Sequence, residues 1–333
     1  MPALKPRKGV IRLKITVLEP LGVTEEEIRE IAKPITDEGH ELVIYDEQTS
    51  DVEVQKERVK DTDVLVIANS PLKGEVIKSA DNLKMLSVAF TGVDHVDLQA
   101  CKEKDVLVCN AAGYSTPAVA ELAFGMIISL LRNIVPLDEV TRKGGTMEGY
   151  SQREFHGKTL GVVGTGAIGS RVAHIGLAFG SEVIAYNRSE SEELKAKGVE
   201  YKSLEDVFKE SDIISIHLPL TDQTKGIISE DILNLMKEDA LLINTARGPI
   251  VDNEALAEVL TEGKIAGAGI DVFDMEPPLP NDYSLLHTDS TVLAPHIGFA
   301  SQEAMVRRAD IVFSNISLWK EGKPANVIPI KDI

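Results

Sequence analysis

The sequence has few cysteines that could form disulfides or metal sites, so its fold must be stabilised by a hydrophobic core. Its 333 residues include two cysteines, Cys101 and Cys109, and a single tryptophan. The cysteines lack the spacing of metal ligands, so we predict buried, reduced thiols and no metal site. The most apolar segment, residues 118–131, is interrupted by Glu121 and is too short to cross a bilayer. Residues 1–14 show no signal-peptide pattern either, so we expect a cytoplasmic protein without a membrane partner.

Positive charge is also scarce. Lys and Arg number 35 against 53 Asp and Glu, which gives a formal net charge of -18 at pH 7. A field of this sign repels polyanions, so nucleic-acid binding is not expected. It also repels small anions, so an enzyme that acts on them needs a local cation in its pocket. The 43% hydrophobic and 26% charged residues are ordinary for globular chains and exclude wholesale disorder, collagen and coiled coil.

Short runs rich in Val, Ile and Leu recur along the chain and alternate with helical patterns. Strands are expected over residues 13–18, 41–45, 64–68, 85–90 and 106–109, and again over 159–163, 182–186, 213–217, 240–244, 266–271 and 291–294. Helices are expected over residues 24–37, 116–132, 170–179 and 301–321. This alternation predicts two α/β units, each a parallel sheet with helices on both faces. The tail from Ser301 is expected to fold back onto the first unit.

Two helix starts carry recognisable signals. Thr24 is followed three residues later by Glu27, which is the spacing of a capping box. Thr116 is a candidate N-cap, because Pro117 suits the first position of a helix.

The strongest motif follows the first strand of the second unit. Residues 161–169 read Gly-Val-Val-Gly-Thr-Gly-Ala-Ile-Gly and contain G-x-G-x-x-G between a strand and a helix. Gly164 suits the tight turn, Gly166 lets the backbone approach a pyrophosphate, and Gly169 lets helix and strand pack closely. Free N–H groups at the helix N-terminus then bind the phosphates. The motif predicts dinucleotide binding; the alternative is a glycine-rich turn without a ligand.

The end of the next strand bears on the choice of dinucleotide. NAD enzymes usually have an acid there, which accepts a hydrogen bond from the ribose 2′-hydroxyl. This chain has Asn187, Arg188 and Ser189 instead. None of these three residues is a carboxylate that would repel a 2′-phosphate, and Arg188 could bind that phosphate. Three glutamates within residues 190–193 count against a 2′-phosphate in this loop. The cofactor is predicted to be NAD(H) or NADP(H), with the balance towards NADP(H); the alternative for Arg188 is a solvated surface cation.

Three polar residues, Arg247, Glu276 and His296, each lie beyond a different strand of the second unit. The carboxyl ends of parallel strands share one edge of a sheet, where ligands bind. Arg247 offers a planar fork for a carboxylate, and His296 can protonate a developing alkoxide. Glu276 can orient the imidazole. With a hydride from a nicotinamide, this set predicts reversible reduction of a 2-oxo acid to a 2-hydroxy acid. Taken singly, each residue also has an ordinary structural interpretation in a turn or loop.

Together these segments resemble the D-isomer-specific 2-hydroxyacid dehydrogenases over nearly the whole chain. The segments that carry the resemblance are residues 164–169 (GTGAIG), 217–221 (HLPLT), 244–248 (NTARG), 269–273 (GIDVF), 276–277 (EP) and 294–298 (APHIG). The resemblance implies a homodimer with an α/β fold of two doubly wound parallel-sheet domains. A Rossmann-type nucleotide domain, residues 113–299, is then inserted into a flavodoxin-like substrate domain, residues 1–112 plus 300–333.

The resemblance also implies a role for each motif. Arg247, Glu276 and His296 resemble the family's catalytic arginine, glutamate and histidine. The implied cofactor-binding residues are Gly164, Thr165, Gly166, Ala167, Ile168, Gly169, Asn187, Arg188, Ser189, His217, Leu218, Pro219, Thr224, Thr245, Ala246, Asp271 and Thr116. The implied substrate-binding residues are Asn69, Ser70, Phe90, Thr91, Gly92 and Val93, together with Arg247 and His296.

Departures from the family pattern narrow the expected substrate. Residues 68–72 contain no arginine for a phosphate, which counts against phosphoglycerate dehydrogenase. Residues 114–117 (YSTP) resemble glycerate and hydroxypyruvate reductases, so a small 2-oxo acid such as glyoxylate or hydroxypyruvate is expected. A formate dehydrogenase would have glutamine in place of Glu276. The alternatives are a phosphoglycerate dehydrogenase-like enzyme and a non-enzymatic, NAD-sensing protein like the family's corepressors.

Overall fold

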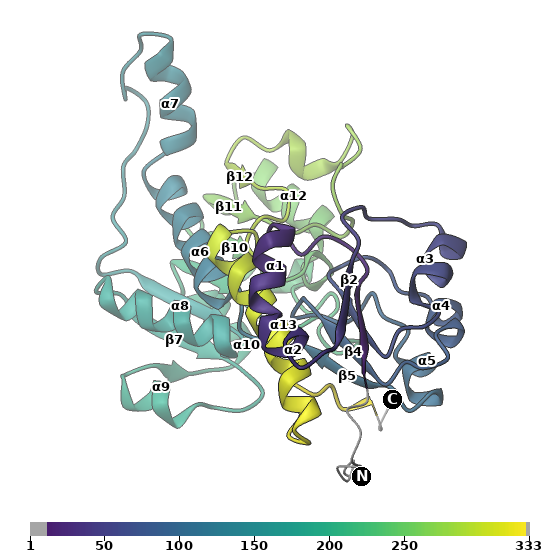
Figure 1. Ribbon diagram of the computed structural model, residues 1–333. Helices are drawn as coiled ribbons and strands as arrows, with labels where there is room; N and C mark the ends of the chain where they lie inside the picture. Colours follow the sequence, from purple (N-terminus) through teal and green to yellow (C-terminus); the bar gives the residue numbers. More distant parts are fainter. Residues whose placement is uncertain (1–11, 331–333) are drawn as a thin grey trace. The chain divides into compact units, whose positions relative to one another are not determined.

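The computed structural model describes residues 12–330, which fold as two compact units (Figure 1). Unit 1 contains the described residues up to Ser115 and those from Ala300 onwards, and unit 2 is Thr116–Phe299. Residues 113–115 fall in unit 1, where the Tyr114 ring is buried and lies 5.9 Å from the Arg308 guanidinium. Most of residues 1–14, where no signal-peptide pattern was expected, lie outside the described residues.

Unit 1 is built on a parallel sheet with the strand order β2-β1-β3-β4-β5. This is the order of flavodoxin-like doubly wound sheets, and it confirms the predicted fold class. Every residue of β3 and β4 is buried, as expected for central strands covered on both faces. The strands are β1 (Lys14–Val17), β2 (Glu41–Ile44), β3 (Val64–Ile67), β4 (Met85–Val88) and β5 (Leu107–Asn110).

Helices from both ends of the chain complete unit 1. They are α1 (Glu25–Ile31), α2 (Lys33–Thr36), α3 (Val52–Val59), α4 (Gly74–Ser79), α5 (Leu98–Glu103) and α13 (Gln302–Lys320). The long α13, yellow in Figure 1, packs on α1 and on β4. The C-terminal helix thus belongs to the N-terminal unit, because it covers one face of that sheet.

The capping box at the first helix is confirmed. The Thr24 hydroxyl accepts from the Glu27 N–H at 3.2 Å, and the Glu27 carboxylate accepts from the Thr24 N–H at 2.7 Å. The single helix expected over residues 24–37 is wrong, however, since α1 and α2 are separate. Pro34 lies in the first turn of α2 and lacks the N–H that a continuous helix would need there.

Unit 2 is built on a seven-stranded parallel sheet with the order β12-β11-β10-β9-β6-β7-β8. The strands are β6 (Thr159–Val163), β7 (Glu182–Tyr186), β8 (Glu200–Tyr201), β9 (Ile213–Ile216), β10 (Leu241–Asn244), β11 (Gly267–Ile270) and β12 (Thr291–Leu293). The order runs outwards from β6 in one direction and from β9 in the other, which is the Rossmann arrangement. A ligand in such a fold binds at the carboxyl ends of the two strands where the order reverses.

Helices cover both faces of the second sheet. Apolar side chains of α6 and α8 pack on one face, and those of α10, α11 and α12 pack on the other. The helices are α6 (Thr116–Leu131), α7 (Ile134–Arg142), α8 (Ala167–Ala178), α9 (Glu192–Ala196), α10 (Leu204–Glu210), α11 (Glu230–Leu233) and α12 (Asn253–Thr261). Thr116 is the first residue of α6 itself, so its assignment as the N-cap is wrong by one position.

One helix of unit 2 was not expected. A change of direction at Asn133, which has φ 47°, separates α6 from α7, and no residue of α7 is buried. Among the described residues no single helix is long and apolar enough to cross a membrane. Helices α6 and α7 reach the required length and apolar composition only together, with a 58° bend between them, and much of α6 is buried in the core of unit 2.

Both cysteines lie in unit 1 as free, buried thiols, as predicted. Burial raises the pKa of the Cys101 thiol to about 12 and that of the Cys109 thiol to about 11. Both thiols are therefore protonated and unreactive near neutral pH. No group of His, Cys, Asp and Glu side chains within residues 12–330 is arranged to hold a metal ion.

Candidate active site

The glycine-rich segment joins β6 to α8 and has the shape of a phosphate-binding turn. Gly164 has φ +98°, and a Cβ there would lie 2.8 Å from the His217 carbonyl carbon. A Cβ at Gly169 would lie 1.8 Å from the Gly164 carbonyl oxygen. Gly166 faces open space: apart from its chain neighbours, no described atom lies within 4 Å of its ideal Cβ, and it caps the 12-residue α8 without a side-chain hydrogen bond. The N–H groups that open α8 are thus accessible to a pyrophosphate, and the turn fits a dinucleotide.

Two buried polar atoms support this fit. His217 Nδ1 and Thr245 Oγ1 are inaccessible to water and have no hydrogen-bond partner among the described residues. The other ring nitrogen of His217, Nε2, lies 2.8 Å from Ser215 Oγ. Burial lowers the pKa of His217 to about 3, so the imidazole is neutral at physiological pH. Buried polar atoms without partners are rare in folded chains, and a bound ligand is one way to satisfy them.

The segment after β9 is held in a closed turn next to the glycine-rich segment. Thr224 Oγ1 donates to the Pro219 carbonyl at 2.6 Å and accepts from the Thr221 N–H at 2.8 Å. Strand β9 pairs with β6, so this turn and the glycine-rich turn lie at neighbouring strand ends. Residues 217–219, predicted to lie along the cofactor, therefore start from the point where the strand order reverses.

The loop after β7 presents a free cation. The Asn187 side chain donates to the Ser189 carbonyl at 2.7 Å and shapes the loop. Arg188 is exposed and forms no ion pair with any residue in the described part of the chain. The glutamates that counted against a 2′-phosphate are each paired with a lysine of the same region. Glu190 and Glu192 pair with Lys195, and Glu193 pairs with Lys197.

Arg247 follows β10 in a turn that Asn244 fixes. The Asn244 side chain is 1% exposed; it donates to the Arg247 carbonyl and accepts from the Ala246 N–H, both at 3.1 Å. A Cβ at Gly248 would lie 1.8 Å from the carbonyl carbon of Phe273, so this turn packs closely against the loop after β11. Arg247 forms no ion pair within residues 12–330. Its half-buried guanidinium donates from Nη1 to the Ala246 carbonyl at 2.8 Å, and its remaining N–H groups can bind a carboxylate.

Asp271 follows β11 and holds the segment that carries His296. The carboxylate of Asp271 accepts the N–H groups of Ile297 and Gly298, both at 2.8 Å, and its carbonyl accepts the N–H of His296 at 2.8 Å. Burial raises the pKa of Asp271, while the two backbone N–H groups act in the opposite direction. These bonds hold His296 at φ 58°, a backbone conformation that side chains seldom adopt and that recurs at functional sites.

The His296 ring is oriented by Glu276. His296 Nδ1 lies 3.1 Å from each carboxylate oxygen of Glu276. A carboxylate only accepts, so the proton on this contact belongs to Nδ1 and the other ring nitrogen, Nε2, remains for a ligand. The Phe299 ring meets the imidazole edge to face, with 5.4 Å between the ring centres.

The strand order explains why these residues share one edge. Strands β10, β11 and β12 are adjacent and parallel, so Arg247, Asp271 and His296 all follow the carboxyl ends of neighbouring strands. Thr116 opens α6 and is half-buried. The structure thus brings an oriented imidazole, and a guanidinium that forms no ion pair within residues 12–330, to the sheet edge that also carries the glycine-rich turn.

Unit 1 contains the other predicted substrate-binding residues. Asn69 is exposed, whereas Ser70 is buried and its hydroxyl donates to Glu19. The Glu19 carboxylate is 3% exposed and also accepts the N–H groups of Ala68 and Ser70, at 2.8 and 3.1 Å. Ser70 therefore holds its own loop in place. Glu19 escaped prediction because it lies about fifty residues away, after a different strand.

The segment after β4 presents backbone rather than side-chain donors. Phe90 is buried, and the carbonyls of Thr91 and Val93 accept from the Asn110 side chain at 2.7 Å and the Val96 N–H at 3.0 Å. No described residue accepts a hydrogen bond from the N–H groups of Thr91, Gly92 or Val93. Open N–H groups of this kind suit an anion.

Comparison with known proteins gives a consistent picture. Residues 124–298 match the model of the D-isomer specific 2-hydroxyacid dehydrogenase NAD binding domain. A glyoxylate reductase of Korarchaeum cryptofilum is 37% identical, over 93% of this chain and 96% of that protein. A hydroxypyruvate reductase of Thermotoga maritima is 40% identical, over 80% of this chain and 87% of that protein. Among solved structures, an acyclic imino acid reductase in complex with NADPH and D-Arg is similar, with a TM-score of 0.85 and 32% identity over 95% of this chain and 100% of that one.

Proposed function

Because this chain belongs to the D-isomer-specific 2-hydroxyacid dehydrogenase family, and is therefore an NAD(P)-dependent oxidoreductase of CH–OH groups, we propose that it reduces glyoxylate or hydroxypyruvate with NADPH. One observation carries this proposal. His296, whose Nδ1 is 3.1 Å from the Glu276 carboxylate, lies at the same sheet edge as Arg247, which forms no ion pair with any described residue. We assign residues 113–299 as the nucleotide domain and residues 1–112 plus 300–333 as the substrate domain.

The residues divide the chemistry between them. A bound NAD(P)H supplies the hydride. Arg247 binds the carboxylate of the 2-oxo acid in a fork and so orients the neighbouring ketone. His296 gives the proton on Nε2 to the ketone oxygen as negative charge develops there. Glu276 accepts from the other ring nitrogen, Nδ1, and keeps the ring in that orientation.

A small substrate is favoured over a phosphorylated one. The relatives described above are named as reductases of glyoxylate and hydroxypyruvate. Residues 68–72 provide no arginine for a phosphate, and the Ser70 hydroxyl in this segment is bonded to Glu19. The segment after β4 has open N–H groups but no cation among residues 90–93. These features favour a 2-oxo acid without a phosphate over 3-phosphoglycerate.

The preference for NADPH rests on charge. Arg188 is unpaired among the described residues, while the glutamates that follow it are paired with Lys195 and Lys197. A 2′-phosphate in this loop would meet a free guanidinium and partly neutralised carboxylates. The similar imino acid reductase, whose structure contains NADPH, is consistent with this preference.

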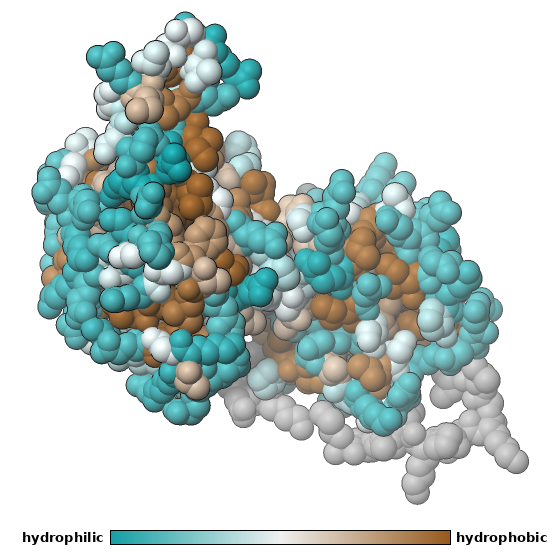
Figure 2. Space-filling view, turned by 90° about the vertical axis from the view of Figure 1, so that its left-hand side faces the viewer, coloured by the Kyte–Doolittle hydropathy of each residue, from teal (hydrophilic) through white to brown (hydrophobic). Residues whose placement is uncertain are grey.

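A homodimer is also proposed, from the surface around α7. No residue of this helix is buried, although several of its side chains are apolar. Ile134 is 48% and Val135 55% exposed, and Met147, just beyond the helix, is 66% exposed. Figure 2 shows apolar side chains gathered on this part of unit 2. A nine-residue helix is marginal alone in water, so we assign a second copy of the chain as the element that covers it. The free, buried thiols suit the reducing cytoplasm, where we place the protein.

The dimer is tested by sedimentation equilibrium of wild type and of Val135→Glu. We expect the wild type to sediment as a dimer and the variant to dissociate at micromolar concentration, because a charge at the centre of an apolar interface is costly. Glu139→Gln, on the same helix, is the matched control. A monomeric wild type, or a variant that remains as tightly dimeric as the control, contradicts the proposal.

The proposed reaction is tested by loss of reduced-nicotinamide absorbance. NADPH and NADH are each paired with glyoxylate, hydroxypyruvate, 3-phosphohydroxypyruvate, pyruvate and a branched 2-oxo acid. We expect the highest kcat/KM for NADPH with glyoxylate or hydroxypyruvate. A higher value with the phosphorylated acid would favour the phosphoglycerate dehydrogenase-like alternative. Tight NADPH binding without turnover of any acid would favour a cofactor-sensing protein.

A further inference from the structure

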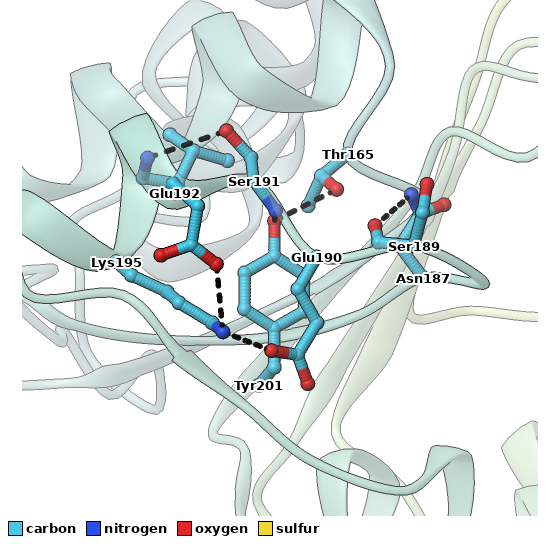
Figure 3. A network of polar contacts seen from close by, with 9 residues as sticks. Thr165, Asn187, Ser189, Glu190, Ser191, Glu192, Lys195 and Tyr201 are labelled. Atoms are coloured by element: carbon cyan, nitrogen blue, oxygen red, sulfur yellow. Dashed lines mark hydrogen bonds and ion pairs between the residues drawn. The ribbon is translucent and has the colours of Figure 1, made fainter.

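The hydroxyl of Tyr201 joins two segments that the cofactor is proposed to contact. Tyr201 ends β8, and its hydroxyl accepts from the Ser191 N–H at 3.0 Å and donates to Thr165 Oγ1 at 2.9 Å. Figure 3 shows the phenol between these two groups. Thr165 belongs to the glycine-rich turn, and Ser191 ends the loop that begins at Asn187. One oxygen atom therefore bridges the phosphate turn and the loop that carries Arg188.

The sheet fixes where this oxygen lies. Strand β8 is paired to β7 at two positions, with Tyr201 opposite Ala185, and the N–H of Lys202 donates to the Ala185 carbonyl at 2.9 Å. The Tyr201 ring thus starts beside the end of β7, from which the Asn187 loop leaves. Thr165 is itself 8% exposed, so the bond on that side is largely shielded from water.

The same bridge bears on the charges around Arg188. Ser191 is the N-cap of α9, and its side chain accepts from the Leu194 N–H. Helix α9 carries Lys195, which pairs with Glu190 and Glu192. These two hydrogen-bonded carboxylates raise the pKa of Lys195, which keeps it charged. The Tyr201 hydroxyl thus holds the start of the helix whose Lys195 pairs with the two glutamates that follow Arg188.

We propose that Tyr201 is a positioning residue that fastens the phosphate turn to the cofactor-selecting loop, so that both are preformed before a dinucleotide binds. The proposal rests on the proposed function, because it requires a dinucleotide at residues 164–169. A preformed site does not lose affinity to the ordering of loops on binding. Tyr201 acts through Thr165 and Ser191, and it selects NADPH through the geometry of the loop with Arg188.

Tyr201→Phe removes only the bridging oxygen. Its effect is measured as the Kd of NADPH and of NADH, by nicotinamide fluorescence without substrate, and as KM for glyoxylate at saturating NADPH. We expect the Kd of NADPH to rise roughly three- to ten-fold, the range for loss of a typical hydrogen bond, with a smaller rise for NADH. The KM of glyoxylate and kcat at saturating NADPH should not change. Tyr45→Phe is the matched control, because Tyr45 lies in unit 1 with its ring under Arg58.

A second pair of variants tests the bridge from its other end. Thr165→Val removes the acceptor of the Tyr201 hydroxyl, whereas Thr165→Ser keeps it, so the Kd of NADPH should rise more in the valine variant. Combined with Tyr201→Phe, the valine change should add less than its own separate effect, because both remove one bond. This comparison also decides the question if Tyr201→Phe does not fold.

The outcomes separate the two proposals. A lower melting temperature for Tyr201→Phe with an unchanged Kd of NADPH would mean that the hydroxyl only stabilises the fold, and would overturn the inference while leaving the proposed function intact. Fully additive effects of Tyr201→Phe and Thr165→Val would overturn it as well. A wild-type protein that binds neither NADPH nor NADH would overturn both proposals.

Discussion

The two ends of the unit 2 sheet hold their functional groups by different interactions. At β10 to β12 the buried Asp271 accepts backbone N–H groups and so fixes the segment that carries His296, although Glu276, the partner of the His296 ring, is exposed. At β7 and β8 the groups are exposed, and charge is arranged by surface pairs such as Lys195 with Glu192. Exposed ion pairs contribute little and are screened by salt, whereas salt screens buried hydrogen bonds much less. We propose that chemistry belongs to the β10 to β12 end, here called the rigid end, and cofactor selection to the β7 and β8 end, here called the adjustable end.

The largest effect should follow from breaking the rigid end. His296→Ala removes the proposed proton donor, so we expect kcat to fall by roughly 10²- to 10⁴-fold. The Kd of NADPH should stay within about two-fold of wild type, because the cofactor is bound elsewhere on the sheet edge. Stopped-flow turnover and fluorescence titration measure the two quantities. His287→Ala, an exposed imidazole of the same unit, is the control. Undiminished turnover in His296→Ala would rule out the assigned proton donor.

A smaller and selective effect should follow from the adjustable end. Arg188→Ala removes the cation proposed for the 2′-phosphate, so the Kd of NADPH should rise roughly 10- to 100-fold, the range for a charge-assisted hydrogen bond. The Kd of NADH should be nearly unaffected. Added salt should weaken NADPH binding to wild type more than to the variant. Equal losses for both cofactors would show that Arg188 does not read the phosphate.

A third effect concerns stability rather than activity, and it involves His217, which follows β9 near the middle of the sheet. His217 titrates near 6.5 when unfolded, and burial lowers its pKa to about 3 in the folded chain. The folded state therefore binds fewer protons, and stability is present above pH 6.5 and is lost as pH falls towards 3. His217→Asn should reduce the pH slope of the unfolding free energy by up to about 1.4 kcal/mol per pH unit in this window.

Urea unfolding at several pH values between 4 and 6 measures this slope, with His156→Asn as the exposed control. An unchanged slope in His217→Asn would mean that the imidazole is protonated at the same pH in both states.

Much of this arrangement follows from local sequence. The alternation of apolar strands and helices predicts both sheets, and strand-order rules then bring Arg247 and His296 to one edge without any three-dimensional information. The glycine-rich turn of residues 164–169 is also predictable from local sequence, because positions 164 and 169 require glycine for steric reasons. Gly164 has φ +98°, and there is no room for a Cβ at Gly169.

Other features depend on contacts that no local pattern encodes. Strand β8 has only two residues and no apolar run, so neither the strand nor the Tyr201 bridge is visible in the sequence. Glu19 contacts Ser70 at the ends of the neighbouring strands β1 and β3, about fifty positions away in the sequence. No residue of helix α7 is buried, so the helical pattern there lacks the buried stripe that prediction relies on.

The independence of the two ends is tested most directly by a double-variant cycle. The kcat/KM for NADPH with saturating glyoxylate is measured for wild type, His296→Ala, Arg188→Ala and the double variant. If chemistry and cofactor selection are separate, the two losses multiply, and the coupling between them is within about 0.5 kcal/mol of zero. A double variant no slower than His296→Ala alone would contradict that separation and would place both residues in one functional unit.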